Sequence, residues 1–165
     1  MLLALLLALN AQAFELNIFY APEVTELQKE RIERIAKRVS EVADSGSFAT
    51  MAQSHRYKCF DRKNLPQGVQ TINDVLENVS NQNAIIHVSF FTSDNSVVGS
   101  TTGNHIMFNT TFFDRNSDAR VANTLFHESL HSVGYGHCGK NNIRFFPKIK
   151  KSVPYRFGNF MQELY

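Results

Sequence analysis

Three histidines fall within eleven residues of the C-terminal half, and their spacing constrains how this segment can fold. His127 and His131 are four residues apart, so on a helix their side chains lie one turn apart on the same face. Gly134 lets the chain leave that helix in a conformation that a residue with a Cβ resists, and this returns His137 toward the other two. Three imidazoles at this spacing predict a zinc site with an open fourth ligand position, which is typical of catalytic zinc.

Glu128 lies between the first two histidines and is expected to act beside the metal rather than bind it. From that position its carboxylate can reach a water on the metal and serve as a general base. The alternative is an amphipathic helix with incidental histidines in its last turn, where histidine favours the helix dipole. That alternative accounts for one histidine, but not for three at ligand spacing with a glycine break.

The whole segment resembles the His-Glu-x-x-His-x-x-Gly-x-x-His signature of the metzincin zinc metallopeptidases. The resemblance implies one catalytic Zn²⁺ held by His127, His131 and His137, with Glu128 as general base and a protein or peptide as substrate. It also implies a long first helix and the zinc helix packed under one twisted sheet. An extended substrate would add a strand to the sheet edge near residues 97–101.

Several features depart from the metzincin pattern. Met161 is the only methionine after the motif, and the resemblance makes it the candidate for the family's methionine turn. The chain ends four residues later, so we expect the family's C-terminal helix to be missing. Cys138 follows the third histidine as in archaemetzincins, and residues 103–105 partly resemble a metal loop of matrixins, so no subfamily is assigned. Tyr155 or Tyr165 is a candidate to approach the metal.

Composition and the N-terminus indicate one secreted domain. A chain of 165 residues, with 43% hydrophobic and 19% charged residues, fits a single globular domain over residues 14–165. Residues 1–13 combine a Leu/Ala run with a small-x-small cleavage site, as in a signal peptide, unless the start is misplaced. The run is too short to span a bilayer, so we expect no membrane anchor. A net charge of +2 gives no reason to expect a nucleic acid partner, and we expect a monomer.

If the protein is exported, its two cysteines can form a disulfide and its two sequons can be glycosylated. Cys59 and Cys138 either form a disulfide, as an oxidising compartment favours, or one thiolate contacts the metal. Asn78 and Asn109 begin Asn-x-Ser/Thr sequons and are glycosylation candidates if the host modifies secreted proteins.

Periodicity predicts an α+β fold with a mixed, twisted sheet of about five strands. The expected order is a strand at 16–20, a long helix at 23–42, a strand at 55–60, a helix at 71–79, a strand at 84–91, short strands at 97–98 and 105–108, and a helix from Ser117 or Asp118 to 133. The strand at 84–91 is apolar enough to be central, and the last helix carries the zinc motif.

Two further points remain open. A secreted zinc-binding effector or pseudoenzyme is the alternative to a peptidase, and the expected lack of a C-terminal helix motivates it. No acidic residue lies between Glu128 and Glu163, whereas that stretch carries six basic ones: Lys140, Arg144, Lys148, Lys150, Lys151 and Arg156. This basic stretch either attracts an acidic substrate or is a solvated loop.

Overall fold

The computed structural model describes residues 14–57, 71–94, 97–137, 150 and 152–165. Within these residues, six helices accompany four strands. The strands are β1 (Glu15–Tyr20), β2 (Asn83–Phe91), β3 (Gly99–Thr102) and β4 (His105–Asn109). The helices are α1 (Glu26–Ala43), α2 (Gly46–Ser54), α3 (Ile72–Ser80), α4 (Thr110–Arg115), α5 (Asp118–Ser132) and α7 (Val153–Leu164). The predicted α+β class is confirmed.

The strands form one mixed sheet in the order β1-β2-β4-β3. β1 and β4 both run parallel to β2, and β3 pairs antiparallel with β4 at one edge. The central position predicted for the apolar strand at 84–91 is therefore confirmed. The sheet has four described strands rather than about five.

The predicted strand at 55–60 is wrong for its described part. α1 ends at Ala43 with Asp44 as its C-cap, and Ser45 directly after it begins α2 by accepting a hydrogen bond from the backbone N–H of Phe48. Phe48 and Ala52 then lie one turn apart on the helix, and both side chains are buried. A helix therefore places the apolar residues of this segment in the core. His55 is the C-cap of α2, and the hydroxyl of Tyr57 donates a hydrogen bond to the carbonyl of Ala52 at 3.0 Å.

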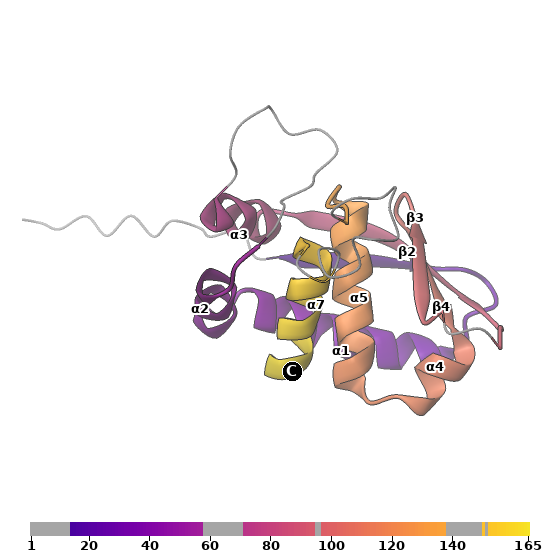
Figure 1. The fold of residues 1–165 in the computed structure, drawn as a ribbon. Helices are drawn as coiled ribbons and strands as arrows, with labels where there is room; N and C mark the ends of the chain where they lie inside the picture. The colour runs from indigo at the N-terminus through magenta and orange to yellow at the C-terminus, as the bar shows by residue number, and fades with distance from the viewer. Residues whose placement is uncertain (1–13, 58–70, 95–96, 138–149, 151) are drawn as a thin grey trace, which may run out of the picture.

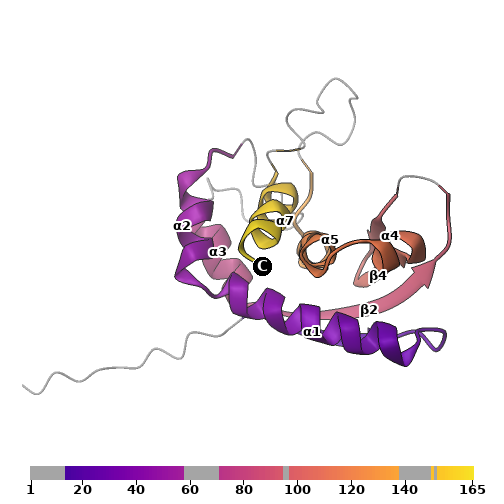
Figure 2. The same cartoon turned by 90° about the horizontal axis from the view of Figure 1, so that it is seen from below.

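The predicted long first helix and the helix at 71–79 are confirmed. Thr25 caps α1 and Thr71 caps α3, each through a capping box with the residue three positions on. α1 and α5 pack against one face of the sheet, where Ile86 and Val88 of β2 are buried, and this confirms the predicted two-helix layer. Figure 1 shows α5 crossing α1, and Figure 2 shows α5 nearly end-on above it.

α7 is a C-terminal helix that was not predicted from the sequence. Ser152 precedes it, Pro154 lies in its first turn, and it runs beside α5 in the opposite direction (Figure 1). A cluster of aromatic rings holds α7 to α2 and α5. Its members include Phe48, Phe126, Phe157 and Phe160, with ring centroids between 5.0 and 6.4 Å apart.

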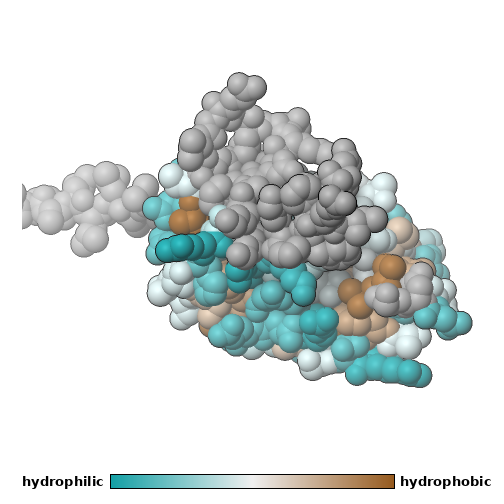
Figure 3. Space-filling view, viewed as in Figure 1, coloured by the Kyte–Doolittle hydropathy of each residue, from teal (hydrophilic) through white to brown (hydrophobic). Residues whose placement is uncertain are grey.

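The described surface is mostly hydrophilic in the view of Figure 3, with a small hydrophobic area toward the edge of the sheet. None of the described helices is both long and apolar enough for a membrane span.

Candidate metal centre

α5 is held at both ends, and this fixes the direction of its histidines. At the N-terminus, Asp118 accepts hydrogen bonds from Arg31 at 2.8 Å and from Arg34 at 3.0 Å, which ties α5 to α1. At the C-terminus, Gly134 has φ of +100°, the left-handed conformation that glycine adopts without strain. The chain reverses there, and the N–H of Tyr135 donates to the carbonyl of Leu130 at 2.9 Å. The predicted role of Gly134 is confirmed.

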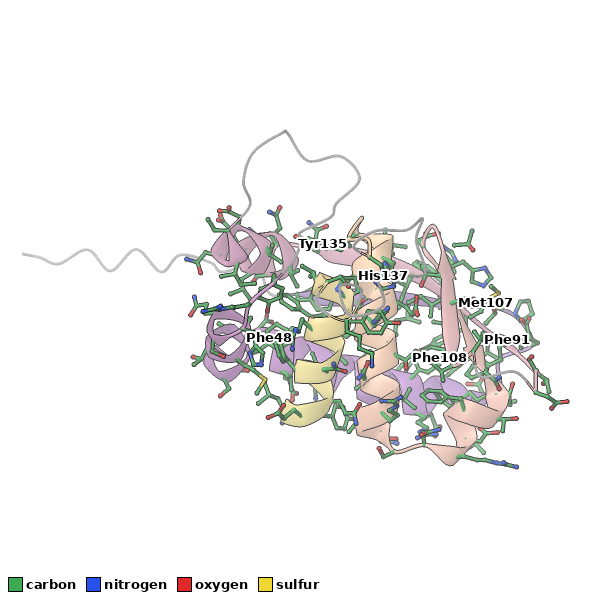
Figure 4. The ribbon with its side chains drawn as sticks, in the orientation of Figure 1. Phe48, Phe91, Met107, Phe108, Tyr135 and His137 are labelled. Atoms are coloured by element: carbon green, nitrogen blue, oxygen red, sulfur yellow. The ribbon has the colours of Figure 1, made fainter. Side chains whose placement is uncertain are left out.

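The reversal brings the three predicted histidines together. One ring nitrogen from each of His127, His131 and His137 lies within 4.8 Å of the others. Nε2 of His131 is 3.0 Å from Nε2 of His137. His127 and His131 come from successive turns of α5, whereas His137 comes from the segment after Gly134, and Figure 4 shows it beside the start of α7. The cluster could hold a metal ion.

The remaining ring nitrogens are hydrogen bonded away from the cluster centre. Nδ1 of His131 lies 2.6 Å from the carbonyl oxygen of Tyr135, which can only accept, so Nδ1 carries the proton. In neutral His131 the lone pair is then on Nε2, facing His137. Nδ1 of His137 lies 3.2 Å from Oγ of Ser152. The ring of His127 forms a hydrogen bond with the backbone of Pro154. Because proline has no backbone N–H, the acceptor is the Pro154 carbonyl.

This arrangement fits a divalent transition metal. Lone pairs of neutral imidazoles that converge at 3.0 Å repel one another unless a proton or a cation lies between them. Burial, with the charges of His131 and His137, lowers the pKa of His127 to about 3, although its bond to Pro154 acts to raise it. His127 is therefore neutral at neutral pH, which is the form that binds metals. Hydrogen bonds from the outer nitrogens orient ligand histidines in metal sites generally.

Glu128 faces the opposite side of the cluster, toward the sheet. Its Oε2 accepts a hydrogen bond of 2.5 Å from the hydroxyl of Thr101 in the edge strand β3. Burial raises the pKa of Glu128, although the Thr101 bond and the charge of His131 act to lower it. None of the described residues hydrogen bonds to Oε1. Oε1 is thus the oxygen available for proton transfer.

A cavity of about 400 Å³ opens on the cluster. We call it the site cavity, and its lining residues are Val97, Val98, Gly99, Arg120, Asn123, Thr124, His127, Glu128, His137, Tyr155 and Asn159. A larger cavity, of about 540 Å³, lies between β1 and α1 and contains no histidine. The smaller cavity is the better candidate site because two of the three clustered histidines, His127 and His137, line it together with Glu128.

α7 supplies a part of the centre that sequence reasoning missed. Ser152, which precedes α7, contacts His137, and Pro154, in the first turn of α7, contacts His127. The ring of Tyr155 lies 4.7 Å from that of His127 and 4.8 Å from that of His137, so this tyrosine does approach the cluster. Tyr165 lies elsewhere, with its carbonyl accepting from Arg38. A serine and a proline ahead of apolar residues at helical spacing are a helix-start signal that could have revealed α7.

Two predicted features need correction, and three more are untested. Met161 lies within α7 with its side chain fully buried, so it is a core residue and not part of a methionine turn. Asn109 is only 3% exposed, and its amide donates to the carbonyls of Ser93 and Val97, so a glycan on that nitrogen is incompatible with the fold. Asn78 stays a prediction. Cys59, Cys138 and residues 1–13 lie outside the described residues.

The chain was compared with models of known families, with curated proteins and with solved structures. None of the three comparisons gives a match. The support for the candidate metal centre therefore comes from its motif and its geometry.

Proposed function

We propose that this protein is a zinc-dependent endopeptidase of metzincin type. The observation that carries the proposal is the convergence of three histidines, with ligand nitrogens within 4.8 Å, beside a carboxylate that is not one of them. The His-Glu-x-x-His-x-x-Gly-x-x-His pattern, and the left-handed turn at Gly134 that delivers His137, support the same assignment.

The chemistry divides between the metal and Glu128. His127, His131 and His137 would hold the zinc ion, which would supply Lewis acidity to lower the pKa of a water and to polarise a peptide carbonyl. Glu128 takes one proton from the attacking water at Oε1 as the new C–O bond forms. It then delivers that proton to the departing nitrogen as the C–N bond breaks. Thr101 holds the other carboxylate oxygen and so orients Glu128 through both steps.

The position of β3 suggests how a substrate is presented. β3 is the edge strand of the sheet, and Thr101 within it contacts Glu128. A peptide that pairs with β3 would therefore pass in front of the histidine cluster with its backbone extended. We also propose that the enzyme acts outside the cell, because residues 1–13 have the composition of a signal peptide.

The proposal is tested by digesting a denatured protein and a peptide library, with and without a chelator, and reading the products by mass spectrometry. We expect cleavage that the chelator abolishes and that added zinc restores. Glu128→Gln should retain zinc and lose cleavage, because only the proton carrier is removed. A Glu128→Gln protein that still cleaves at the wild-type rate would exclude Glu128 from the mechanism.

The alternative, a zinc-binding effector or pseudoenzyme, has no observation that favours it. Its motivation was the expected lack of a C-terminal helix, but α7 is present and contributes to the cluster. The same digest distinguishes the two, because the alternative requires zinc binding without hydrolysis of any peptide in the library.

A further inference from the structure

The site cavity extends along α5, away from the histidines. Five of its lining residues belong to α5: Arg120, Asn123, Thr124, His127 and Glu128. Their spacing of three, four, seven and eight residues places them on one face of the helix. Arg120 lies seven residues before His127, a rise of about 10 Å along the axis. The cavity therefore has the metal cluster at one end and a guanidinium at the other.

Side-chain amides from α7 hold this distal end in place. Asn123 donates to Asn159 at 3.2 Å and to Gln162 at 3.0 Å, and Arg120 donates to the same oxygen of Gln162 at 3.3 Å. Gln162 and Asn159 are neutral, so they direct the guanidinium without cancelling its charge. Figure 3 shows a hydrophilic surface over the adjoining ends of α5 and α7.

The positive charge of Arg120 is not neutralised by a described carboxylate. Asp118, two residues earlier, is already paired with Arg31 and Arg34. Glu128, the acidic residue among those that line the cavity, faces Thr101 at the opposite end. Arg120 also lies in the first turn of α5, where the helix dipole favours anions.

We propose that Arg120 selects substrates that carry a carboxylate within about three residues of the cleaved bond, since an extended peptide advances about 3.3 Å per residue. Arginine binds a carboxylate through two parallel N–H donors, and this geometry makes it specific for the group. The carboxylate is supplied either by an Asp or Glu side chain or by a peptide C-terminus. The inference depends on the proposed peptidase function, because the cleaved bond defines the register.

The test uses peptide pairs that differ only by Glu or Gln at each of the three positions on either side of the cleaved bond. Each pair is made with a free and with an amidated C-terminus. We measure kcat/KM with the zinc-loaded wild type and dissociation constants with Glu128→Gln, which retains the cavity but not the proton carrier. Arg120→Gln removes the charge under test, and Arg115→Gln removes an equal charge from α4, outside the site cavity.

For the wild type we expect a preference of about fivefold for the carboxylate peptide at one position, the upper range for an exposed ion pair. In Arg120→Gln the ratio should fall to about one, whereas Arg115→Gln should keep it. A preference for the free C-terminus alone would identify the terminal group as the source. Equal kcat/KM values for the Glu and Gln peptides of every pair would overturn the inference, as would a preference for the carboxylate peptide that persists in Arg120→Gln. Either result would leave the peptidase assignment intact. Tighter binding of the carboxylate peptides without cleavage of any peptide would instead overturn the peptidase assignment and leave carboxylate recognition by Arg120 intact.

Discussion

The backbone of Gly158 in α7 lies against His127 in α5. A Cβ built on Gly158 would come within 3.3 Å of Cβ of His127 and within 2.7 Å of Oδ1 of Asn123. The glycine therefore permits the close helix contact that brings the first turn of α7 to the histidines. Its role is steric, because it lies within the helix and not in a left-handed turn.

Replacing Gly158 with alanine should separate α5 from α7. We expect Gly158→Ala to lower the free energy of unfolding by about 1–3 kcal/mol, the usual cost of overpacking, and to weaken metal binding. Urea unfolding measures the first effect. Gly46→Ala is the matched control, because a Cβ at Gly46 meets no atom within 4 Å, and its stability should be unchanged or slightly higher. Equal stabilities for the two variants would contradict a tight helix contact at Gly158.

Ser152 should contribute to metal affinity rather than to helix capping. It occupies the N-cap position of α7, but its side chain makes no capping hydrogen bond and instead contacts Nδ1 of His137. We expect Ser152→Ala to weaken zinc binding about tenfold, as loss of an outer hydrogen bond to a ligand histidine commonly does. Competition with a chromophoric chelator gives the affinity. Ser54→Ala, in α2, should bind as wild type, and an unchanged affinity for Ser152→Ala would remove this serine from the centre.

Thr101 should matter for catalysis and not for zinc content. Thr101→Val keeps the shape of the side chain but removes the hydroxyl that holds Oε2 of Glu128. We expect kcat/KM to fall about tenfold while the protein retains its metal, because only the orientation of the proton carrier is lost. Steady-state kinetics and metal analysis of the same sample provide the two values. Loss of zinc together with activity would indicate instead that Thr101 supports the fold of the site.

The ion pair at the start of α5 should make stability depend on pH. Burial acts to raise the pKa of Asp118, but hydrogen bonds and charges from Arg31 and Arg34 outweigh it and lower the pKa below its usual value. A carboxyl with a lowered pKa in the folded state stabilises the fold above its unfolded pKa of about 3.9. That contribution disappears as the pH falls through the lower, folded value.

Asp118→Asn measures this contribution directly. At neutral pH we expect the variant to be less stable than the wild type by about 1 kcal/mol, a modest value because the Asp118 side chain is 29% exposed. The difference should shrink toward zero as the pH falls below about 4. Thermal unfolding of both proteins across this range provides the comparison. A difference that stays constant with pH would mean that charge is not its cause.

The three-histidine cluster was largely predictable because its geometry is local. His127 and His131 follow from the helical period, and Gly134 signals the reversal that delivers His137. The contacts from Thr101, Ser152 and Pro154 were not predicted, because each joins segments 15 to 27 residues apart in the chain. Spacing within one element carries no information about such pairs.

Elements with strong periodicity were also predictable, and weaker ones were not. The strand at 84–91 has a run of apolar and β-branched residues, and α1 has an apolar stripe with a capping residue. In contrast, α2 was missed because Ser45 both follows one helix and caps the next. α7 was missed because Met161 was assigned to a family turn, although Val153, Phe157, Phe160 and Met161 follow a helical period.

The metal content of purified, folded protein tests the central claim most directly. We predict that wild type equilibrated with zinc and then desalted retains one zinc ion per chain, that a chelator removes it, and that His131→Ala and His137→Ala retain almost none while still folded. His87→Ala, on the exposed face of β2, should retain as much zinc as wild type. A folded wild type that stays free of metal in excess zinc would contradict the three-histidine centre and the function built on it.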